Sequence, residues 1–398
     1  MRSDLRRRVP NSVLHLVQPV EGGVAQVVTD LVRAQTETGM RTLVACPSGG
    51  WLGRAAAAAG AEVRLWVAER GPGPNLPWET ACAARVIRRA RPDVVHLHSA
   101  KAGLAGRLAL RGRLPTVFQP HAWSFEALGA PASVLAAGWE RFGARWAHRV
   151  LCVSEAERER GLRAGIAARW SVIPNGVDLT RFPETGGVAR RQARAALAAV
   201  HALPQRAPLV VCVGRLCRQK GQDLLLRAWP RVTAQLPEAR LVLVGEGPEG
   251  RALRAAAAVG TLFAGHTDDT LPWYAAADLV VLPSRWEGMA LAPLEAMAVG
   301  RPVVLTDVGG ADESLPPGHA AHCLVPPEDP AALGEALAAL LGDARRRVLL
   351  GEQAADHVRA VHDVRRAADA CGRLYEELTA PEDPGPEAAP EAREFSRP

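Results

Sequence analysis

The sequence predicts an α/β protein of two tandem doubly wound domains that face each other across a cleft. Three observations predict this fold class. Short apolar runs alternate with helical patterns along most of the chain, which is typical of parallel sheets covered by helices. The chain has 398 residues, and chains of this size usually divide into separate cores. A polar, arginine-rich stretch at residues 184–194 separates the alternation into two series.

Each series consists of six apolar runs that we expect to be strands. The first comprises residues 13–17, 42–46, 63–67, 94–98, 116–119 and 150–154, and the second comprises residues 209–213, 241–244, 261–264, 279–283, 303–306 and 322–325. Residues 172–178 contain proline, Asn-Gly and aspartate, so the linker is expected just after them. Residues 330–378 show three helical patterns and no strand.

These patterns divide the chain into five parts. They are a basic N-terminal arm (1–11), a first α/β domain (12–185), a second α/β domain (186–361), a C-terminal helix (362–380) and a disordered tail (381–398) that is rich in proline, glutamate and alanine. Ligands of open parallel sheets bind beyond the carboxyl ends of the strands, so we expect the chemistry in the loops after these runs.

The charge is distributed unevenly between the two halves. Residues 1–185 carry 25 basic and 15 acidic side chains, whereas residues 186–398 carry 23 and 27. The first half is therefore predicted to face an anionic partner. Arginine outnumbers lysine 46 to 2, so Lys101 and Lys220 stand out as positions where a compact ammonium group was kept. The basic residues lack an accompanying aromatic-rich stretch, so nucleic-acid binding is not expected.

The sequence predicts a cytoplasmic location. Its seven cysteines contain no C-x-x-C pair, which favours free thiols in a reducing compartment. No apolar run reaches the length of a membrane-spanning helix, and the arginine-rich first ten residues are not followed by the apolar segment of a signal peptide.

The loop after residues 209–213 is a candidate diphosphate site. It reads Gly214-Arg215-Leu216-Cys217-Arg218-Gln219-Lys220-Gly221 and leads into a helical pattern. Arg215 and Lys220 would place two positive charges beside a helix N-terminus, which itself favours anions. The alternative is an ordinary solvated basic turn.

The loop after residues 279–283 carries two glutamates, Glu287 and Glu295, separated by seven residues. Pro293 suits the first position of a helix, which would place Glu295 in the first turn and Glu287 in the loop before it. The backbone amides between them are then free to bind an anion or sugar hydroxyls, and a carboxylate can accept both hydrogen bonds of a ribose diol. Taken singly, Glu295 could be a helix-capping acid and Glu287 a surface acid.

Four motifs in this order resemble the family 4 retaining glycosyltransferases, which have the GT-B fold of two Rossmann-like domains. They are Glu21-Gly22-Gly23, the segment 172–178, the Gly214–Gly221 loop and the two glutamates. The resemblance runs from about residue 12 to residue 375 and implies an acceptor-binding first domain, a nucleotide-sugar-binding second domain and a last helix that crosses back to the first.

The resemblance also implies roles for individual residues. Arg215 and Lys220 would neutralise the leaving diphosphate, Glu295 would hold the ribose, and Glu287 with the amides of Met289 to Leu291 would hold the transferred sugar. His121, just after residues 116–119, matches the family's active-site histidine, whose alternative is a structural hydrogen-bonding role. Further donor contacts would come from residues beside these motifs: Gly22, Gly23, Gly214, Gly245, Gly288, Met289, Ala290 and Leu291.

The expected activity is transfer of a hexosyl group, with retention of anomeric configuration, to a saccharide, lipid-linked or natural-product acceptor. The donor is a nucleoside-diphosphate sugar, with UDP expected ahead of GDP, and no further cofactor is expected. The sequence contains no Asp-x-Asp motif, so no metal site is predicted, and the leaving diphosphate would be stabilised by Arg215, Lys220 and helix dipoles. Many members have Gly-Phe-Gly where this chain has Gly288-Met289-Ala290. If residue 290 requires a positive φ, Ala290 would force a different loop path around the sugar.

Two other activities stay open. A sugar-nucleotide isomerase could use the same fold without an acceptor. Gly245-Glu246-Gly247-Pro248-Glu249-Gly250 is a formal dinucleotide-binding G-x-G-x-x-G pattern with Asp268 further along, so it indicates an NAD-dependent oxidoreductase. Against that activity, the pattern is expected in the first unit of its sheet, and Pro248 has no N–H for the phosphate turn.

Residues 134–149 predict an amphipathic helix. Leu135, Trp139, Phe142 and Trp146 share one face, and Arg141, Arg145 and Arg149 form a basic stripe on another. Such a helix can lie on an anionic membrane at the cytoplasmic face. The alternative is a core-facing helix with a solvated edge.

Overall fold

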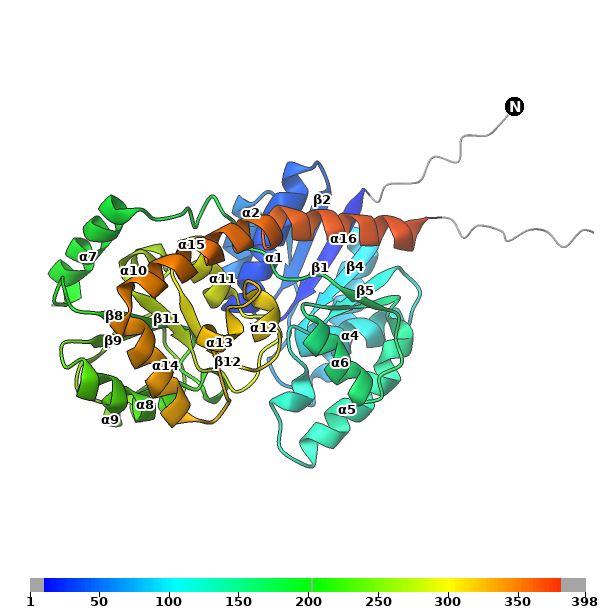
Figure 1. Ribbon diagram of the computed structural model, residues 1–398. Helices are drawn as coiled ribbons and strands as arrows, with labels where there is room; N and C mark the ends of the chain where they lie inside the picture. Colours follow the sequence, from blue (N-terminus) through cyan, green and yellow to red (C-terminus); the bar gives the residue numbers. More distant parts are fainter. Residues whose placement is uncertain (1–10, 202, 381–398) are drawn as a thin grey trace, which may run out of the picture.

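The computed structural model describes residues 11–201 and 203–380. The predicted tail at 381–398, and the predicted N-terminal arm apart from Asn11, lie outside the described residues. The described chain forms two α/β domains side by side (Figure 1). Every strand pair in both sheets is parallel, so the predicted fold class is confirmed.

The first domain contains a seven-stranded sheet in the order β3-β2-β1-β4-β5-β6-β7. Its strands are β1 (Ser12–Val17), β2 (Arg41–Cys46), β3 (Glu62–Leu65), β4 (Val94–His98), β5 (Thr116–Gln119), β6 (Arg149–Cys152) and β7 (Trp170–Val172). Its helices are α1 (Gly23–Glu37), α2 (Leu52–Ala58), α3 (Leu76–Ala90), α4 (Ser99–Leu110), α5 (Ala132–Gly143) and α6 (Glu155–Arg163).

The second domain contains a six-stranded sheet in the order β10-β9-β8-β11-β12-β13. Its strands are β8 (Leu209–Val213), β9 (Arg240–Val244), β10 (Thr261–Gly265), β11 (Leu279–Leu282), β12 (Val303–Thr306) and β13 (Leu324–Val325). Its helices are α7 (Gly187–His201), α8 (Gln222–Gln235), α9 (Gly250–Ala255), α10 (Leu271–Ala276), α11 (Leu291–Ala298), α12 (Ala311–Ser314), α13 (Ala320–Cys323), α14 (Pro330–Gly342) and α15 (Ala344–Val361).

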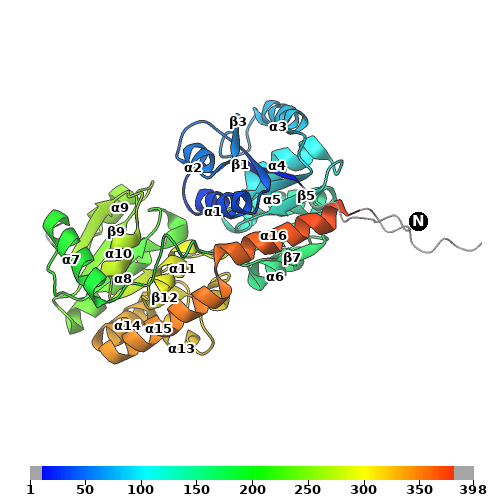
Figure 2. The same ribbon diagram turned by 90° about the horizontal axis from the view of Figure 1, so that it is seen from above.

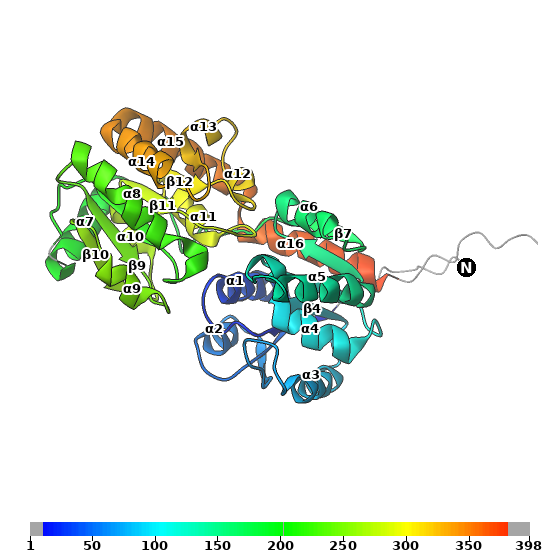
Figure 3. The same ribbon diagram turned by 90° about the horizontal axis from the view of Figure 1, so that it is seen from below.

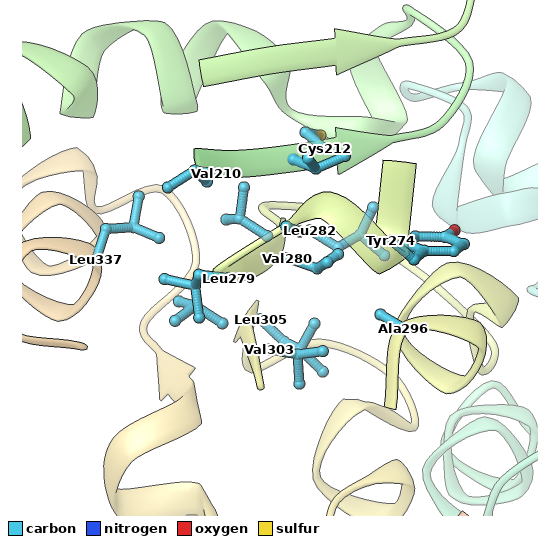
Figure 4. Packing of buried hydrophobic residues seen from close by; sticks show 14 of the residues in the cluster. Val210, Cys212, Tyr274, Leu279, Val280, Leu282, Ala296, Val303, Leu305 and Leu337 are labelled. Carbon is cyan, nitrogen blue, oxygen red and sulfur yellow. The ribbon is translucent and has the colours of Figure 1, made fainter. Parts of the chain in front are cut away.

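Helices cover both faces of each sheet, so the central strands are apolar on both sides, as parallel strands require. In the second domain, Val210, Leu282 and Leu305 meet the helix residues Ala296 and Leu337 in one continuous core (Figure 4). All six residues of β1 are buried, and the only ring among them is the polar imidazole of His15. A buried polar group requires hydrogen-bond partners, which sets this strand apart.

The last helix, α16 (Val364–Thr379), returns to the first domain (Figures 2 and 3). The chain crosses between the domains twice, and Val177 pairs with Asp363 in a parallel bridge where the crossings meet. Leu374 and Tyr375 of α16 then pack in a cluster with Val13 of β1. This helix forms part of the first domain's core although it follows the second domain in sequence.

The structure corrects four expectations about individual elements. The three-residue strand β7 was not predicted. Residues 184–194 are not simply a polar connection, because α7 begins within them. Of the predicted strand 322–325, only Leu324 and Val325 are extended, since residues 320–323 form a helical turn. Arg149 begins β6 instead of continuing the helix at 134–149, which ends at Gly143.

None of the helices in the described ranges is both long enough and apolar enough to span a bilayer.

Candidate active site

Both sheets reverse their strand order at an inner strand pair, and the candidate residues follow these strands. The order changes direction between β1 and β4 in the first sheet and between β8 and β11 in the second. Such switch points open a crevice beyond the carboxyl ends of the strands. The loops after β1, β8 and β11 therefore carry the predicted site residues to one region between the domains.

In the loop after β8, Lys220 lies against Glu287 of the loop after β11. Its Nζ atom is 2.6 Å from Glu287 Oε1, and both side chains are largely buried. Arg215 is exposed, and its side chain makes no ion pair with any described residue. One cation of the predicted diphosphate site is thus bound to a glutamate, and the other is free to meet an anion.

Glycines allow this loop to approach its neighbours closely. Gly221 has a φ of 63°, and a Cβ atom there would lie 2.0 Å from the carbonyl oxygen of Pro283. A Cβ at Gly245 would lie 2.3 Å from the carbonyl oxygen of Gly214, and one at Gly247 would lie 2.3 Å from that of Leu216. The G-x-G-x-x-G pattern is therefore occupied by packing against the loop after β8. It leaves no open cradle for a dinucleotide phosphate at these two glycines.

The carboxylate of Glu287 is held from two sides. Besides Lys220, the Ser284 hydroxyl donates to Oε1 at 2.8 Å. Gly288 follows at the domain boundary, and Met289 is buried. Ala290 has a φ of −75°, so this loop does not require the positive φ considered for residue 290.

Helix α11 begins at Leu291, two residues earlier than predicted, and Glu295 is its fifth residue. Pro293 is tolerated at the third helical position because the first amides of a helix have no intrahelical partner anyway. The expectation that Glu295 lies in the first turn was therefore wrong. No side chain caps this helix, so the amides of Leu291 and Ala292 remain available as predicted.

Glu295 is buried and accepts a hydrogen bond of 2.8 Å from the Tyr274 hydroxyl. Burial raises the pKa of this carboxyl to about 7; the Tyr274 hydrogen bond opposes the rise and nearby Asp30 adds to it. Asp30 lies on α1 of the first domain. Glu295 thus lies where the two domains meet, in a weakly solvated environment.

Three side chains of the first domain hold the backbone of the loop after β11. Arg160 donates to the carbonyl of Glu287 at 2.8 Å, Ser154 donates to that of Gly288 at 3.1 Å, and Asn175 donates to that of Met289 at 2.7 Å. Arg160 and Ser154 were not among the predicted site residues, whereas Asn175 lies within the segment 172–178 that carries part of the family resemblance. These bonds join the candidate sugar loop to the opposite domain.

His121 follows β5 and lies next to this contact. A Cβ at Gly288 would lie 3.1 Å from the amide nitrogen of Ala122, so His121 and the glutamate loop meet across the domain boundary. His121 has a φ of 57° and Ala122 a φ of 90°, a strained backbone of the kind found at functional sites. The amide of Ala122 donates to the buried Glu157 at 2.6 Å, which holds this turn.

The His121 imidazole is half-buried, and burial lowers its pKa to about 3. Its Nε2 atom is 3.0 Å from Nδ1 of His98. The ring is therefore neutral at physiological pH and engaged with a second histidine on one side.

In the loop after β1, Gly22 caps α1 with a φ of 79°, and Gly22 and Gly23 are both exposed. A Cβ atom at either glycine would meet nothing within 4 Å. These two residues leave the N-terminus of α1 open.

The other lysine lies outside the site. Lys101 Nζ is 2.5 Å from Glu79 Oε2 and donates to the carbonyl of Gly71 at 2.7 Å, and the ion pair is buried. Lys101 therefore anchors the connection between β3 and α3.

Comparison with known proteins agrees with these features. The family model described as "Glycosyltransferase Family 4" matches residues 21–181, and the one described as "Glycosyl transferases group 1" matches residues 207–343. Among solved structures, Anabaena Alr3699/HepE in complex with UDP and glucose aligns with a TM-score of 0.79 at 22% identity, covering 92% of this chain and 99% of that one. At this identity the likeness shows the fold.

Mannosyltransferases are among the relatives by sequence. The lipopolysaccharide core biosynthesis mannosyltransferase LpsB of Rhizobium meliloti is 30% identical over 257 residues, which are 61% of this chain and 69% of that protein. A GDP-mannose-dependent monoacylated phosphatidylinositol monomannoside mannosyltransferase of Corynebacterium glutamicum is 34% identical over 204 residues, 47% of this chain. This chain spans 51% of the length of the latter. With both halves matched and the two-domain fold in place, the chain belongs to the family 4 glycosyltransferases of the GT-B fold.

Proposed function

We propose that the protein transfers a hexosyl group from a nucleoside-diphosphate sugar to a saccharide, lipid-linked or small-molecule acceptor, with retention of anomeric configuration. The observation that carries the proposal is the contact of Lys220 with Glu287, beside the free Arg215 and the uncapped start of α11. This arrangement provides cations for a diphosphate and a carboxylate for sugar hydroxyls within one loop pair.

The ion pair suggests how the donor enters. A diphosphate carries more charge than one carboxylate, so it competes with Glu287 for Lys220, and Arg215 adds a second cation. Displacement of Lys220 toward the phosphates frees Glu287 Oε1 to accept hydrogen bonds from the sugar. The leaving diphosphate is then stabilised by positive charge already in place, without a metal ion.

The donor nucleotide is proposed to be UDP ahead of GDP, with the ribose held by Glu295. Relatives use both bases by name: one is GDP-mannose-dependent and another is a UDP-Gal galactosyltransferase of Escherichia coli. The names of these two relatives contain lipid-linked acceptors, whereas other relatives are named D-inositol 3-phosphate glycosyltransferases, which supports a lipid-linked, saccharide or small-molecule acceptor bound by the first domain.

Thermal shifts with UDP, GDP, ADP and NAD, followed by donor hydrolysis with a panel of UDP- and GDP-sugars, test this function. We expect stabilisation by a nucleoside diphosphate and release of sugar from one donor, with NMR of the product showing the anomeric configuration of the donor. Stabilisation by NAD alone would overturn the proposal. Interconversion of the free donor without an acceptor would assign an isomerase.

We also propose that α5 lets the protein bind peripherally to the inner face of an anionic membrane, from a cytoplasmic location. Val134 and Leu135 are 66% and 73% exposed, and Phe142 is 44% exposed with the Arg145 guanidinium 3.9 Å from its ring centre. Trp139 of α5 and Trp146, in the turn that follows the helix, are half-buried. Apolar side chains beside Arg141 and Arg145 fit a lipid surface.

Sedimentation with vesicles of anionic or neutral lipid tests this contact. We expect wild-type protein to bind anionic vesicles and the Arg141→Glu, Arg145→Glu double variant to lose most of this binding. A matched control is Arg163→Glu with Arg158→Glu on α6, which removes the same charge from exposed positions of another helix. If the wild-type protein does not bind anionic vesicles, or if the control variant loses binding equally, the proposal is overturned.

A further inference from the structure

The core of the first domain contains a group of buried histidines that the sugar site does not account for. His15 lies on β1, and His96 and His98 lie on the neighbouring strand β4; all three have no exposed surface. Their ring centres are 4.0 to 5.5 Å apart. A buried polar group without a hydrogen-bond partner destabilises the fold, so the partners of these rings are informative.

Hydrogen bonds link two of these rings to His121. His121 Nε2 is 3.0 Å from His98 Nδ1, and His98 Nε2 is 2.9 Å from His15 Nδ1. His15 Nε2 is 2.9 Å from Oε1 of Gln35, a buried side chain of α1. The three imidazoles and Gln35 therefore form one continuous chain from the domain boundary into the core.

The far end of the chain sets the position of every proton along it. A neutral imidazole carries one N–H and one acceptor nitrogen. Because Gln35 Oε1 can only accept, His15 must carry its proton on Nε2, and its Nδ1 then accepts from His98. By the same step His98 accepts from His121. His121 is thereby held with its proton on Nε2 and a free electron pair on Nδ1.

Two further observations support this direction. The amide nitrogen of Gln35 points to the Tyr375 hydroxyl at 3.5 Å, and that hydroxyl is 2.7 Å from His96 Nδ1, so Tyr375 accepts from Gln35 and donates to His96. This orients the Gln35 amide with its oxygen toward His15. Burial also lowers the pKa of His15 to about 4 and holds that of His98 well below its usual range, so the rings stay neutral.

We propose that His15, His98 and Gln35 are positioning residues that fix the tautomer of His121, leaving Nδ1 as a hydrogen-bond acceptor for a substrate hydroxyl. No described residue bonds to Nδ1 of His121. The inference rests on the proposed function, in which His121 lies at the donor sugar. The strained φ of 57° at His121 is consistent with a ring held in one orientation.

A metal site is the competing use of these rings, since one nitrogen each of His15, His96 and His98 lies within 4.8 Å of the others. A metal requires unprotonated nitrogens free of other bonds. Both ring nitrogens of His15 and of His98 already have partners at 2.9 or 3.0 Å. The hydrogen-bonded chain therefore accounts for the geometry better than a metal does.

The tautomers are read by ¹⁵N–¹H correlation NMR of protein labelled with ¹⁵N-histidine, without any substrate. We expect His15, His98 and His121 all to be neutral with the proton on Nε2. A His121 ring protonated on Nδ1, or a mixture of tautomers, would overturn the proposal. So would one equivalent of Zn²⁺ that shifts His15, His96 and His98 together. This measurement stands whether or not the protein proves to be a transferase.

Kinetics test whether the chain matters for catalysis. Gln35→Met removes the acceptor at nearly constant size, so we expect the His121 tautomer to become mixed and kcat to fall roughly ten- to hundredfold with little change in KM. Gln35→Glu keeps an acceptor oxygen toward His15 while its second oxygen can accept from the Tyr375 hydroxyl, so it should retain the His121 tautomer and most of kcat. Thr36→Val, which removes a hydroxyl from the next position of α1, serves as the control. An unchanged tautomer in Gln35→Met, or a changed tautomer with wild-type kcat, would refute the assignment.

Discussion

Replacing Glu295 by glutamine should stabilise the free protein and weaken nucleotide binding. The pKa of Glu295 is about 7 in the folded chain against an ordinary 4.5. An acid with a raised pKa opposes folding above its unfolded pKa, since the fold then contains a carboxylate that burial disfavours. A pKa shift of this size destabilises the fold by roughly 3 kcal/mol at pH 8 and by about 1 kcal/mol at pH 5, and it has no effect well below pH 4. Glutamine retains an oxygen for the Tyr274 hydroxyl.

The assay is thermal unfolding of both proteins from pH 5 to pH 8. We expect the variant's gain in midpoint to grow with pH and to reach roughly 6 °C at pH 8 for a domain of this size. UDP affinity should fall about tenfold, because a carboxylate presents two acceptor oxygens to the hydroxyls of a ribose and an amide presents only one. A gain that does not change with pH, or a variant less stable than wild type at pH 8, would refute the reasoning.

Glu157 provides the contrast. Burial raises its pKa to about 7 as well, but its two oxygens accept from the amides of Ala122 and Val153 at 2.6 and 2.8 Å. Glutamine would turn an NH₂ group toward one of these amides. Glu157→Gln should therefore destabilise the protein by about 1–3 kcal/mol despite removing the same charge. An equal change in stability in Glu157→Gln and Glu295→Gln would show that burial of the charge alone determines the effect.

Three further outcomes are expected. Lys220→Ala should raise the Kd for UDP at least about tenfold by calorimetry, whereas Arg218→Ala, an exposed cation of the same turn, should change it less than about twofold; equal effects would contradict the site. Gly221→Ala should lower the free energy of unfolding by about 2–4 kcal/mol in urea, because its Cβ would meet the Pro283 carbonyl, while Gly186→Ala, with nothing within 4 Å, should be neutral. Arg107→Met should lower the free energy of unfolding by about 3–5 kcal/mol, because it leaves the buried Glu140 without its ion-pair partner. Adding Glu140→Leu should recover much of that stability. If stability is not recovered, packing and not charge dominates at this pair.

Most strands could be predicted because each is a run of buried apolar residues, a pattern that local sequence contains. The strand β7 escaped because it has three half-buried residues, Trp170 to Val172, with no such run. The start of α11 was misplaced because proline is tolerated at any of the first positions of a helix, where amides are unpaired. Pro293 therefore marks the beginning of the helix only to within a turn.

The site was predictable where its residues are close in sequence. The loop from Gly214 to Gly221 and the pair Glu287 and Glu295 carry their spacing with them. The partner of Lys220 was not predictable. The sequence predicted that Lys220 lies beside a phosphate, whereas in the structure its Nζ atom lies 2.6 Å from Glu287 Oε1. The sequence alone does not distinguish Lys101 from Lys220, since both are rare lysines. The structure does, because Lys101 is buried in an ion pair with Glu79 and is therefore structural.

The histidine chain shows why the interior of such a site is hidden from sequence. Its members come from β1, α1, β4 and the loop after β5, and its orientation depends on Tyr375 of α16, more than 250 residues beyond His121. Tyr375 reaches Gln35 only because the chain crosses back between the domains beside Val177. Since Tyr375 orients the Gln35 amide, the returning helix supplies the last hydrogen bond in the chain that supports His121, as well as apolar cover for α1. The crossing that defines the two-domain fold is then also a condition for the tautomer of His121.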